Sequence, residues 1–286
     1  MKKAQDIQKA AVLGAGTMGH GIAQVMCLAG IETSLYDVVP EGLEKARVSV
    51  KKNLDKGVER GKVDAADREG ALERMKMTGD LDAAVAGASV VFEAVPERLD
   101  LKQELFARLG ELPAEVLLAT NTSSLPITEI AGAAAHPERV CGMHFFNPVH
   151  IMKLVEVVCW EGTSEEAATC ALDLSRRLGK DPIRVNDAPG FASSRLGLAI
   201  GLEAIRMVED NVASAEDIDK AMTLGYGFPM GPLRLTDLVG LDVRLAISEV
   251  LEATLGGRFS APRLLREKVE RGELGKKSGR GFYDWT

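Results

Sequence analysis

The chain lacks the long apolar run that a membrane-spanning helix requires. None of its 286 residues lies in a window approaching about eighteen consecutive apolar residues, and the first residues enter a strand pattern without the apolar core of a signal peptide. The four cysteines are far apart and show no paired short spacing; they are Cys27, Cys141, Cys159 and Cys170. We therefore expect reduced cysteines in a cytoplasmic protein that does not use a membrane as a partner.

The chain also lacks an excess of positive charge. The chain has 35 Lys and Arg against 42 Asp and Glu, a formal net charge of −7. This balance argues against nucleic acid or an anionic membrane as the main partner. No His, Cys or acidic residues show metal-ligand spacing, so no metal site is expected. The 46% hydrophobic content suits a globular enzyme with one large α/β domain and a smaller second one.

A glycine-rich turn stands near the start of the chain. The apolar segment 11–13 leads directly into Gly14-Ala15-Gly16-Thr17-Met18-Gly19, and a helical pattern follows. In this spacing the first glycine permits a tight turn, the second lets the backbone approach a pyrophosphate, and the third lets helix and strand pack closely. The helix N-terminus then offers N–H groups to the anion. The pattern indicates a dinucleotide site; the alternative is a turn that only reverses the chain.

An acidic residue follows at the distance that a dinucleotide site requires. The apolar segment 33–36 ends at Asp37, roughly twenty residues after the glycines. A carboxylate at this position binds the adenosine ribose hydroxyls and repels a 2′-phosphate. Because residues 38–40 add no cation, the sequence favours NAD over NADP.

Strand and helix patterns alternate over the first two thirds of the chain. Helical patterns cover 41–60, which is rich in Lys and Arg, and 99–109; a capping box of Thr163 with Glu166 opens a further helix. We expect strands at 75–78, 90–95, 116–120, 140–145, 154–160 and 182–185. This order predicts a Rossmann-type, doubly wound, mostly parallel sheet within an NAD-binding domain of residues 1–187.

The pattern becomes helical after residue 187. Apolar stripes recur at helical spacing, first at Leu198, Leu202 and Ile205 and then at Leu235, Leu238, Leu241 and Leu245. Residues 188–286 are therefore expected to form a smaller all-α domain. A domain of about a hundred residues with such apolar faces favours burial against a second subunit.

Polar residues gather where strands of the sheet end. Asn121-Thr122-Ser123-Ser124 follows one strand, His144 lies late in the next, and Glu156 stands among apolar, β-branched neighbours. A carboxylate in so apolar a run needs a partner, and an imidazole is a fitting one. A His oriented by a carboxylate can accept the proton of a hydroxyl while a nicotinamide takes the hydride. The alternative is a histidine that only fills the core.

Five motifs in order carry a family resemblance. They are residues 14–19, 121–124, 144–148, 227–232 and 275–283. In these the chain resembles the L-3-hydroxyacyl-CoA dehydrogenase family over essentially its whole length, most closely its single-function bacterial members of the 3-hydroxybutyryl-CoA type.

The resemblance implies a role for further residues. His144 would be the catalytic base, Glu156 its orienting carboxylate, and Ser123 a hydrogen-bond donor to the substrate 3-oxygen. The cofactor side would include Glu97, Lys102, Asn121, Asn147 and Lys277, and the CoA side Asn53, Lys56 and Arg60. The alternatives are a solvated helix start for Glu97 and Lys102, a mobile tail for Lys277 and a solvated basic face for the CoA set.

One position departs from the family pattern. Ser194 stands where the family usually has Asn before Arg195, so we expect activity with an altered acyl preference or a bridging water. The implied activity is reversible, NAD-dependent oxidation of an L-3-hydroxyacyl-CoA of short chain in fatty acid metabolism, by a homodimer joined through the helical domain. The alternatives are a dehydrogenase of a free hydroxy acid or sugar acid, and a catalytically silent NAD-binding relative.

Overall fold

The computed structural model describes residues 1–285 and divides into two compact units. The first is Met1–Ala188 and the second begins at Pro189. Among the described helices, none is long and apolar enough to cross a membrane.

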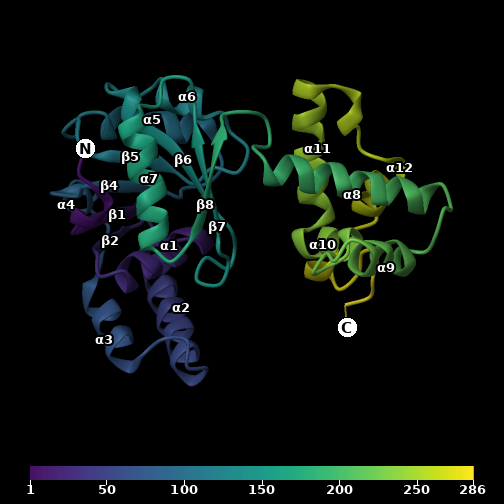
Figure 1. The fold of residues 1–286 in the computed structure, drawn as a ribbon, viewed down its shortest axis with the longest axis horizontal. Helices are drawn as coiled ribbons and strands as arrows, with labels where there is room; N and C mark the ends of the chain where they lie inside the picture. Colours follow the sequence, from purple (N-terminus) through teal and green to yellow (C-terminus); the bar gives the residue numbers. More distant parts are fainter. Residues whose placement is uncertain (286) are drawn as a thin grey trace. The chain divides into compact units, whose positions relative to one another are not determined.

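The first unit is built on one eight-stranded sheet (Figure 1). The strands lie in the order β3-β2-β1-β4-β5-β6-β7-β8; only β7 runs antiparallel to its neighbour β6, while β8 is parallel to β7. Their bounds are β1 Lys9–Leu13, β2 Glu32–Tyr36, β3 Met75–Thr78, β4 Val90–Glu93, β5 Leu117–Thr120, β6 Val140–Phe145, β7 Leu154–Cys159 and β8 Asp181–Asn186. This topology confirms the predicted doubly wound, Rossmann-type fold.

Apolar residues on both faces of the strands explain why helices cover the sheet. Helices α1 (Thr17–Leu28) and α7 (Glu165–Arg177) share one core with alternate strand residues such as Val12 and Phe92. Helices α4 (Leu81–Val85), α5 (Leu99–Leu109) and α6 (Ile127–Ala131) follow the next strands and cover the other face. The carboxyl ends of β1, β2, β4, β5 and β6 consequently meet at one edge, where the site forms.

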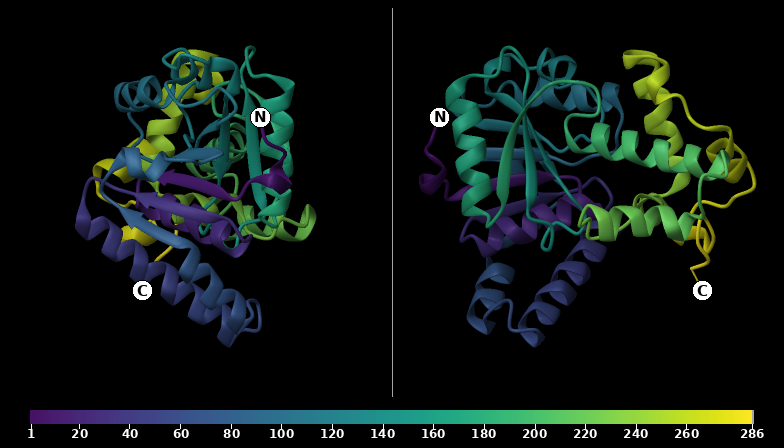
Figure 2. Two further views of the ribbon diagram at one scale, coloured as in Figure 1. Left: turned by 90° about the vertical axis from the view of Figure 1, so that its left-hand side faces the viewer. Right: turned by 45° about the vertical axis from the view of Figure 1, so that its right-hand side comes forward.

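A helical pair extends from this sheet between β2 and β3. Helix α2 (Pro40–Glu59) and helix α3 (Ala65–Arg74) lie side by side and project away from the strands (Figure 2). A small cluster of Cys27, Val50, Leu54 and Ala71 holds the pair to α1. Most of α2 faces solvent, which places its basic residues on the surface.

The predicted capping box of Thr163 with Glu166 is wrong by one residue. Ser164 is the N-cap of α7, and its Oγ accepts a hydrogen bond from the amide of Ala167 at 3.2 Å. Thr163 is buried and its hydroxyl donates to the carbonyl of Val140 at 2.9 Å, while Glu166 pairs with the N-terminal amine. The buried hydroxyl of Thr163 binds a backbone carbonyl, and the half-buried Ser164 caps the helix instead.

The second unit is helical. Its helices are α8 Ser193–Glu209, α9 Ala215–Gly225, α10 Pro232–Val239, α11 Leu241–Leu255 and α12 Arg263–Glu270. The predicted stripe of Leu198, Leu202 and Ile205 on α8 is buried in the core of this unit. Each unit therefore has its own apolar core.

The second predicted stripe is wrong at its start. Leu235 and Leu238 are 40% and 39% exposed, whereas Leu233 is buried. Gly240 has φ +105°, which ends α10 and begins α11, so the helical phase does not continue across it. Two leucines of α10 consequently lie on the surface of this unit.

The C-terminal segment is anchored on one buried carboxylate. Asp237 accepts the amides of Phe282 and Tyr283, each at 2.9 Å, and the indole N–H of Trp285 at 2.8 Å. Lys277 lies in the short 3-10 helix η4 (Lys276–Ser278), and its ammonium pairs with Asp242 at 2.6 Å. Lys277 is therefore held in an ordered turn and not in a free tail.

Candidate active site

The glycine loop between β1 and α1 has the backbone that a dinucleotide site needs. Gly14 has φ +103°, and a Cβ there would lie 2.5 Å from the carbonyl oxygen of Ala94. A Cβ on Gly19 would overlap the carbonyl oxygen of Gly14. At Gly16, by contrast, a Cβ would meet no atom of the described chain within 4 Å beyond its own chain neighbours. Two glycines are thus required by the fold, while Gly16 leaves open space at the N-terminus of α1.

Asp37 fixes this loop from the end of β2. Its Oδ2 accepts the amide of Ala15 at 2.7 Å and its Oδ1 accepts the amide of Val39 at 2.9 Å. Each carboxylate oxygen has a second lone pair, so ribose hydroxyls can still be bound. The open position at Gly16 and the acid at Asp37 fit an NAD molecule: the first leaves room for the pyrophosphate and the second accepts from the ribose.

Replacing Gly16 with alanine is expected to separate cofactor binding from folding. Its φ of −65° suits alanine and the new methyl meets no protein atom, so the melting temperature stays within about a degree. The methyl occupies the space beside the helix N-terminus, so the Kd for NADH rises at least about tenfold. Fluorescence titration measures this, with Gly225→Ala as the control because that position is equally open. An unchanged Kd would place the pyrophosphate elsewhere.

A histidine and a glutamate face each other across the antiparallel pair β6 and β7. His144 and Glu156 are register partners, and Nδ1 of the imidazole lies 2.8 Å from Oε2 of the carboxylate. His144 is 6% exposed and Glu156 is fully buried. The ring of Phe146 packs on the imidazole, with 4.6 Å between the ring centroids. A carboxylate in this position selects the Nδ1–H tautomer, which puts the lone pair on Nε2.

The turn after β5 lies next to this pair. The side-chain oxygen of Asn121 accepts the amide of Phe145 at 2.9 Å, which ties the end of β5 to the end of β6. Ser123 is exposed, and its amide donates to Oε1 of Glu97 at 2.9 Å. Asn121 therefore aligns the strand that carries His144, and Glu97 holds the turn that carries Ser123.

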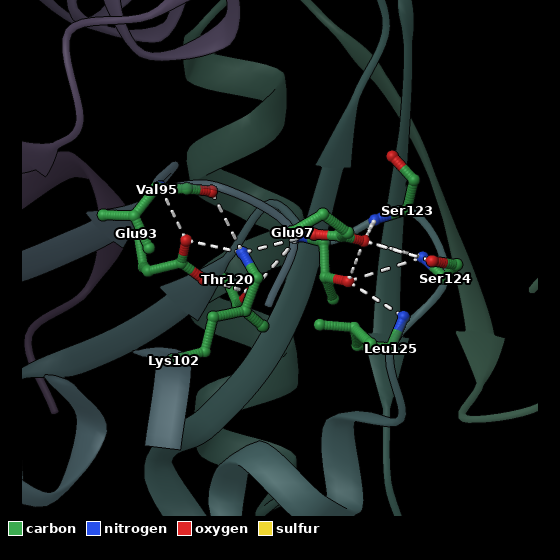
Figure 3. Close-up of polar contacts among 9 residues, drawn as sticks. Glu93, Val95, Glu97, Lys102, Thr120, Ser123, Ser124 and Leu125 are labelled. Atoms are coloured by element: carbon green, nitrogen blue, oxygen red, sulfur yellow. Dashed lines mark hydrogen bonds and ion pairs between the residues drawn. The ribbon is translucent and has the colours of Figure 1, made fainter. Parts of the chain in front are cut away.

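A buried ion pair contacts Glu97, which holds the same turn (Figure 3). Lys102 is 1% exposed, and its ammonium lies 2.6 Å from Oε1 of Glu93, which is fully buried, and 3.3 Å from Oε2 of Glu97. The solvated alternative for Lys102 is therefore wrong. Sequence reasoning missed Glu93, although its signal was that of Glu156: an acid in an otherwise apolar strand, Val90–Glu93.

A cavity of about 370 Å³ opens beside the cofactor loop. Asn53 and Lys56 of α2 line it together with Lys52, and Thr17 and Asn147 line it from the sheet edge. Arg60, at the C-cap of α2, is not among the described lining residues of this cavity, and its contact with CoA stays a prediction. The cavity combines cationic side chains with hydrogen-bond donors, which suits a polyanionic group.

Sequence reasoning also missed Lys180, which supports one wall of this cavity. Lys180 is 8% exposed, and its ammonium donates to the carbonyls of Val149 and Met152, the latter at 2.9 Å. Burial, together with the charge of Lys153, lowers the pKa of Lys180 to about 8. No short motif marks it, because both acceptors are backbone carbonyls.

Two of the expected site residues lie in the second unit. Ser194 is half-buried in the first turn of α8, and Lys277 lies in the anchored C-terminal segment. The remaining residues belong to the first unit: most follow the carboxyl ends of its strands, while Glu156 lies on β7, Lys102 on α5 and the CoA set on α2. Within the described chain, no group of three or more His, Cys, Asp or Glu could hold a metal ion.

A dinucleotide-binding sheet with a buried His–carboxylate pair at its reactive edge defines an NAD-dependent dehydrogenase. Comparison with known proteins narrows this class. The model of the 3-hydroxyacyl-CoA dehydrogenase NAD binding domain matches residues 9–188, and that of the C-terminal domain of the same enzymes matches 190–285. The chain belongs to the 3-hydroxyacyl-CoA dehydrogenase family, as the sequence resemblance indicated.

Individual relatives cover almost the whole chain. It is 46% identical over 282 residues to a probable 3-hydroxybutyryl-CoA dehydrogenase of Bacillus subtilis, covering 98% of both chains. It is 45% identical over 283 residues to a 3-hydroxyadipyl-CoA dehydrogenase of Escherichia coli, covering 98% of this chain and 59% of that one. A solved (S)-3-hydroxybutyryl-CoA dehydrogenase from Ralstonia eutropha superposes with a TM-score of 0.94 at 37% identity, covering 98% of this chain and all of that one.

Proposed function

We propose that this protein oxidises short-chain L-3-hydroxyacyl-CoA, foremost 3-hydroxybutyryl-CoA, to the 3-ketoacyl-CoA and catalyses the reverse reaction. The observation that carries the proposal is the buried pair of His144 and Glu156 at 2.8 Å. The Bacillus subtilis and Ralstonia eutropha relatives, which are named as 3-hydroxybutyryl-CoA dehydrogenases, support the same substrate class.

His144 acts as the general base. Glu156 keeps the proton on Nδ1, so the Nε2 lone pair accepts the proton of the 3-hydroxyl. Bound NAD supplies the acceptor for the hydride that leaves C3. Ser123 donates a hydrogen bond to the 3-oxygen and holds the charge that develops there, and in the reverse direction His144 returns its proton to the same oxygen.

Several residues are proposed to hold the cofactor. Glu97 and Asn147 are exposed at the sheet edge and contact it directly, as does Lys277 from the second unit. Lys102 and Asn121 are buried and already bind Glu93 and the amide of Phe145, which favours a supporting role behind the cofactor surface. NAD and an acyl-CoA are thus the two ligands proposed for this site.

An absorbance assay with NADH and acetoacetyl-CoA tests this function. We expect NADH oxidation with acetoacetyl-CoA at least about a hundredfold faster than with free acetoacetate, and competitive inhibition by free CoA. Preference for the free acid would favour a hydroxy-acid or sugar-acid dehydrogenase. NADH binding without turnover of either would identify a silent relative.

Reversing the charge of Lys56 is expected to weaken the binding of acyl-CoA and to leave the binding of NADH unchanged. Lys56 lines the cavity beside the cofactor loop, so Lys56→Glu opposes the CoA phosphates and raises KM for acetoacetyl-CoA about tenfold. The matched control is Lys51→Glu on the same helix, because Lys51 pairs with Asp55 at 2.9 Å and does not line this cavity. Equal effects of both variants would reduce the role of Lys56 to general surface charge.

The serine that replaces the usual asparagine is proposed to set acyl preference. Ser194 is shorter than asparagine and lacks its amide, so the site gains room or a bridging water. In Ser194→Asn the ratio of kcat/KM for four-carbon against longer 3-ketoacyl-CoA substrates is expected to shift about threefold to tenfold. Steady-state kinetics over an acyl series measures it, with the NADH Kd unchanged as the control. The same ratio in both proteins contradicts the assignment.

We also propose a homodimer formed through the helical unit, in the cytoplasm. The surface of that unit carries exposed apolar side chains that a monomer would leave in water, among them Leu196, Leu235, Leu238, Val239 and Val250. Sedimentation equilibrium of the purified protein measures the association.

A further inference from the structure

Glu93 is a charged side chain that the proposed reaction does not use. It is fully buried at the end of β4, and each of its oxygens is bound: Oε1 by the ammonium of Lys102 at 2.6 Å and the amide of Val95 at 2.7 Å, and Oε2 by the hydroxyl of Thr120 at 2.6 Å. Burial raises the pKa of Glu93, and the neighbouring Lys102 opposes that shift. The geometry is that of a fully satisfied buried ion pair.

Such a pair contributes little to stability by itself. Desolvating two charges costs about as much as their attraction returns, and well-packed neutral residues are often equally stable. The charges therefore point to a specific task. A candidate for that task is the positioning of Glu97, because the ammonium of Lys102 also lies 3.3 Å from Oε2 of Glu97.

Glu97 uses its other oxygen to organise the turn after β5 (Figure 3). Its Oε1 accepts the hydroxyl of Thr122 at 2.6 Å, the amide of Ser123 at 2.9 Å and the amide of Ser124 at 3.2 Å. Burial raises the pKa of Glu97, but these hydrogen bonds and the charge of Lys102 outweigh it, so the net shift is downward. One carboxylate oxygen thus faces the buried ammonium while the other gathers the turn that carries Ser123.

We propose that Glu93 is a positioning residue for the reaction: it fixes the ammonium of Lys102, which orients Glu97, which holds Ser123 at the substrate 3-oxygen. This inference rests on the proposed function of Ser123. The chain of contacts runs from the core to the reactive edge within the first unit, through three side chains and one turn. Ser123 itself is exposed and its amide donates to Glu97 at 2.9 Å, so its alignment depends on this support.

Neutralising Glu93 alone is expected to impair both folding and activity. Glu93→Gln leaves Lys102 with only Glu97 as counter-ion, which lowers the melting temperature and draws the Glu97 carboxylate away from the turn. The value of kcat/KM for acetoacetyl-CoA falls about tenfold to a hundredfold, because a displacement of Ser123 by about 1 Å can lower the rate by up to about a hundredfold. This variant cannot by itself separate a positioning role from a structural one.

The double variant Glu93→Gln with Lys102→Met separates the two roles. Both buried charges are removed, so the melting temperature returns to within a few degrees of the parent, while Glu97 still lacks its ammonium. We expect kcat/KM for acetoacetyl-CoA to remain at least about tenfold low. Amide hydrogen exchange of the segment 121–126 in the cofactor-free protein is expected to be faster than in the parent. The matched control is Glu165→Gln with Arg184→Met, which removes a surface pair of the same unit and leaves both measurements unchanged.

The outcomes distinguish the inference from the proposed function. Recovery of activity together with stability in the double variant overturns the positioning role, as does unchanged exchange of segment 121–126. If the parent protein does not turn over acetoacetyl-CoA, the proposed function fails. The exchange measurement still decides whether Glu93 and Lys102 hold the turn.

Discussion

Replacing His144 with glutamine is expected to lower kcat about 10³- to 10⁴-fold while NADH still binds. The imidazole has a ring nitrogen that can accept the proton of the hydroxyl, and an amide of similar size is not a base. His144 lies on β6, away from the glycine loop between β1 and α1, so the Kd for NADH is expected to stay within about twofold. Stopped-flow or steady-state NADH absorbance gives kcat, and fluorescence titration gives the Kd.

The control for this variant is His136→Gln. His136 is an exposed histidine that also faces a carboxylate, that of Glu138 at 3.6 Å, but it lies outside the sheet edge. Its replacement is expected to leave kcat unchanged. A His144→Gln protein that loses NADH affinity in proportion to its activity would identify His144 as a structural residue.

Replacing Glu156 with glutamine is expected to lower kcat about a hundredfold or more without destabilising the protein. The amide group of glutamine can donate to Nδ1, which shifts the imidazole proton to Nε2 and removes the base from the substrate side. The free energy of unfolding is expected to stay constant or rise, because a fully buried charge is removed while the hydrogen bond to the ring remains. Kinetics and denaturant titration measure the two quantities.

A loss of stability that parallels the loss of activity would contradict this role. Glu138→Gln serves as the control, since it neutralises the acid of the surface His–Glu pair and is expected to change neither quantity. The two pairs differ in burial, with Glu156 fully buried and the side chain of Glu138 54% exposed. The comparison therefore isolates the effect of a carboxylate that solvent does not reach.

Much of the first unit could be predicted because its strands are short apolar runs separated by helical patterns. Strand β6 was predicted at its observed bounds, and Glu156 was expected to face an imidazole because an acid in an apolar strand needs a polar partner. Glu93 also stands in an apolar strand and needs a partner in the same way, but the sequence does not show that this partner is Lys102. Its partner Lys102 looks solvated in the sequence, since it follows the polar start of a helix, and only the packing of α5 on the sheet buries it.

Other features could not be predicted because they depend on contacts between distant segments. The anchoring of the C-terminal segment on Asp237 joins residues about 45 apart, and nothing near Asp237 marks it as an acceptor. The exposed Leu235 follows from the change of helical phase at Gly240, which periodicity alone did not reveal. In both cases the local sequence pattern predicts a helix, whereas contacts between distant segments determine the partners of Asp237 and the exposure of Leu235.

The antiparallel pairing of β6 and β7 has a consequence for how the protein loses activity on heating. His144 and Glu156 are joined by strand register, so they separate only when two interior strands of the sheet open, and the free energy of that opening approaches that of global unfolding. Ser123 is the exposed residue of a turn whose amides bind the carboxylate of Glu97 and the hydroxyl of Thr122, and a turn of this kind can open locally at lower cost than two paired interior strands. As temperature rises, alignment of the substrate oxygen is therefore lost first, while proton transfer remains available until the sheet itself melts.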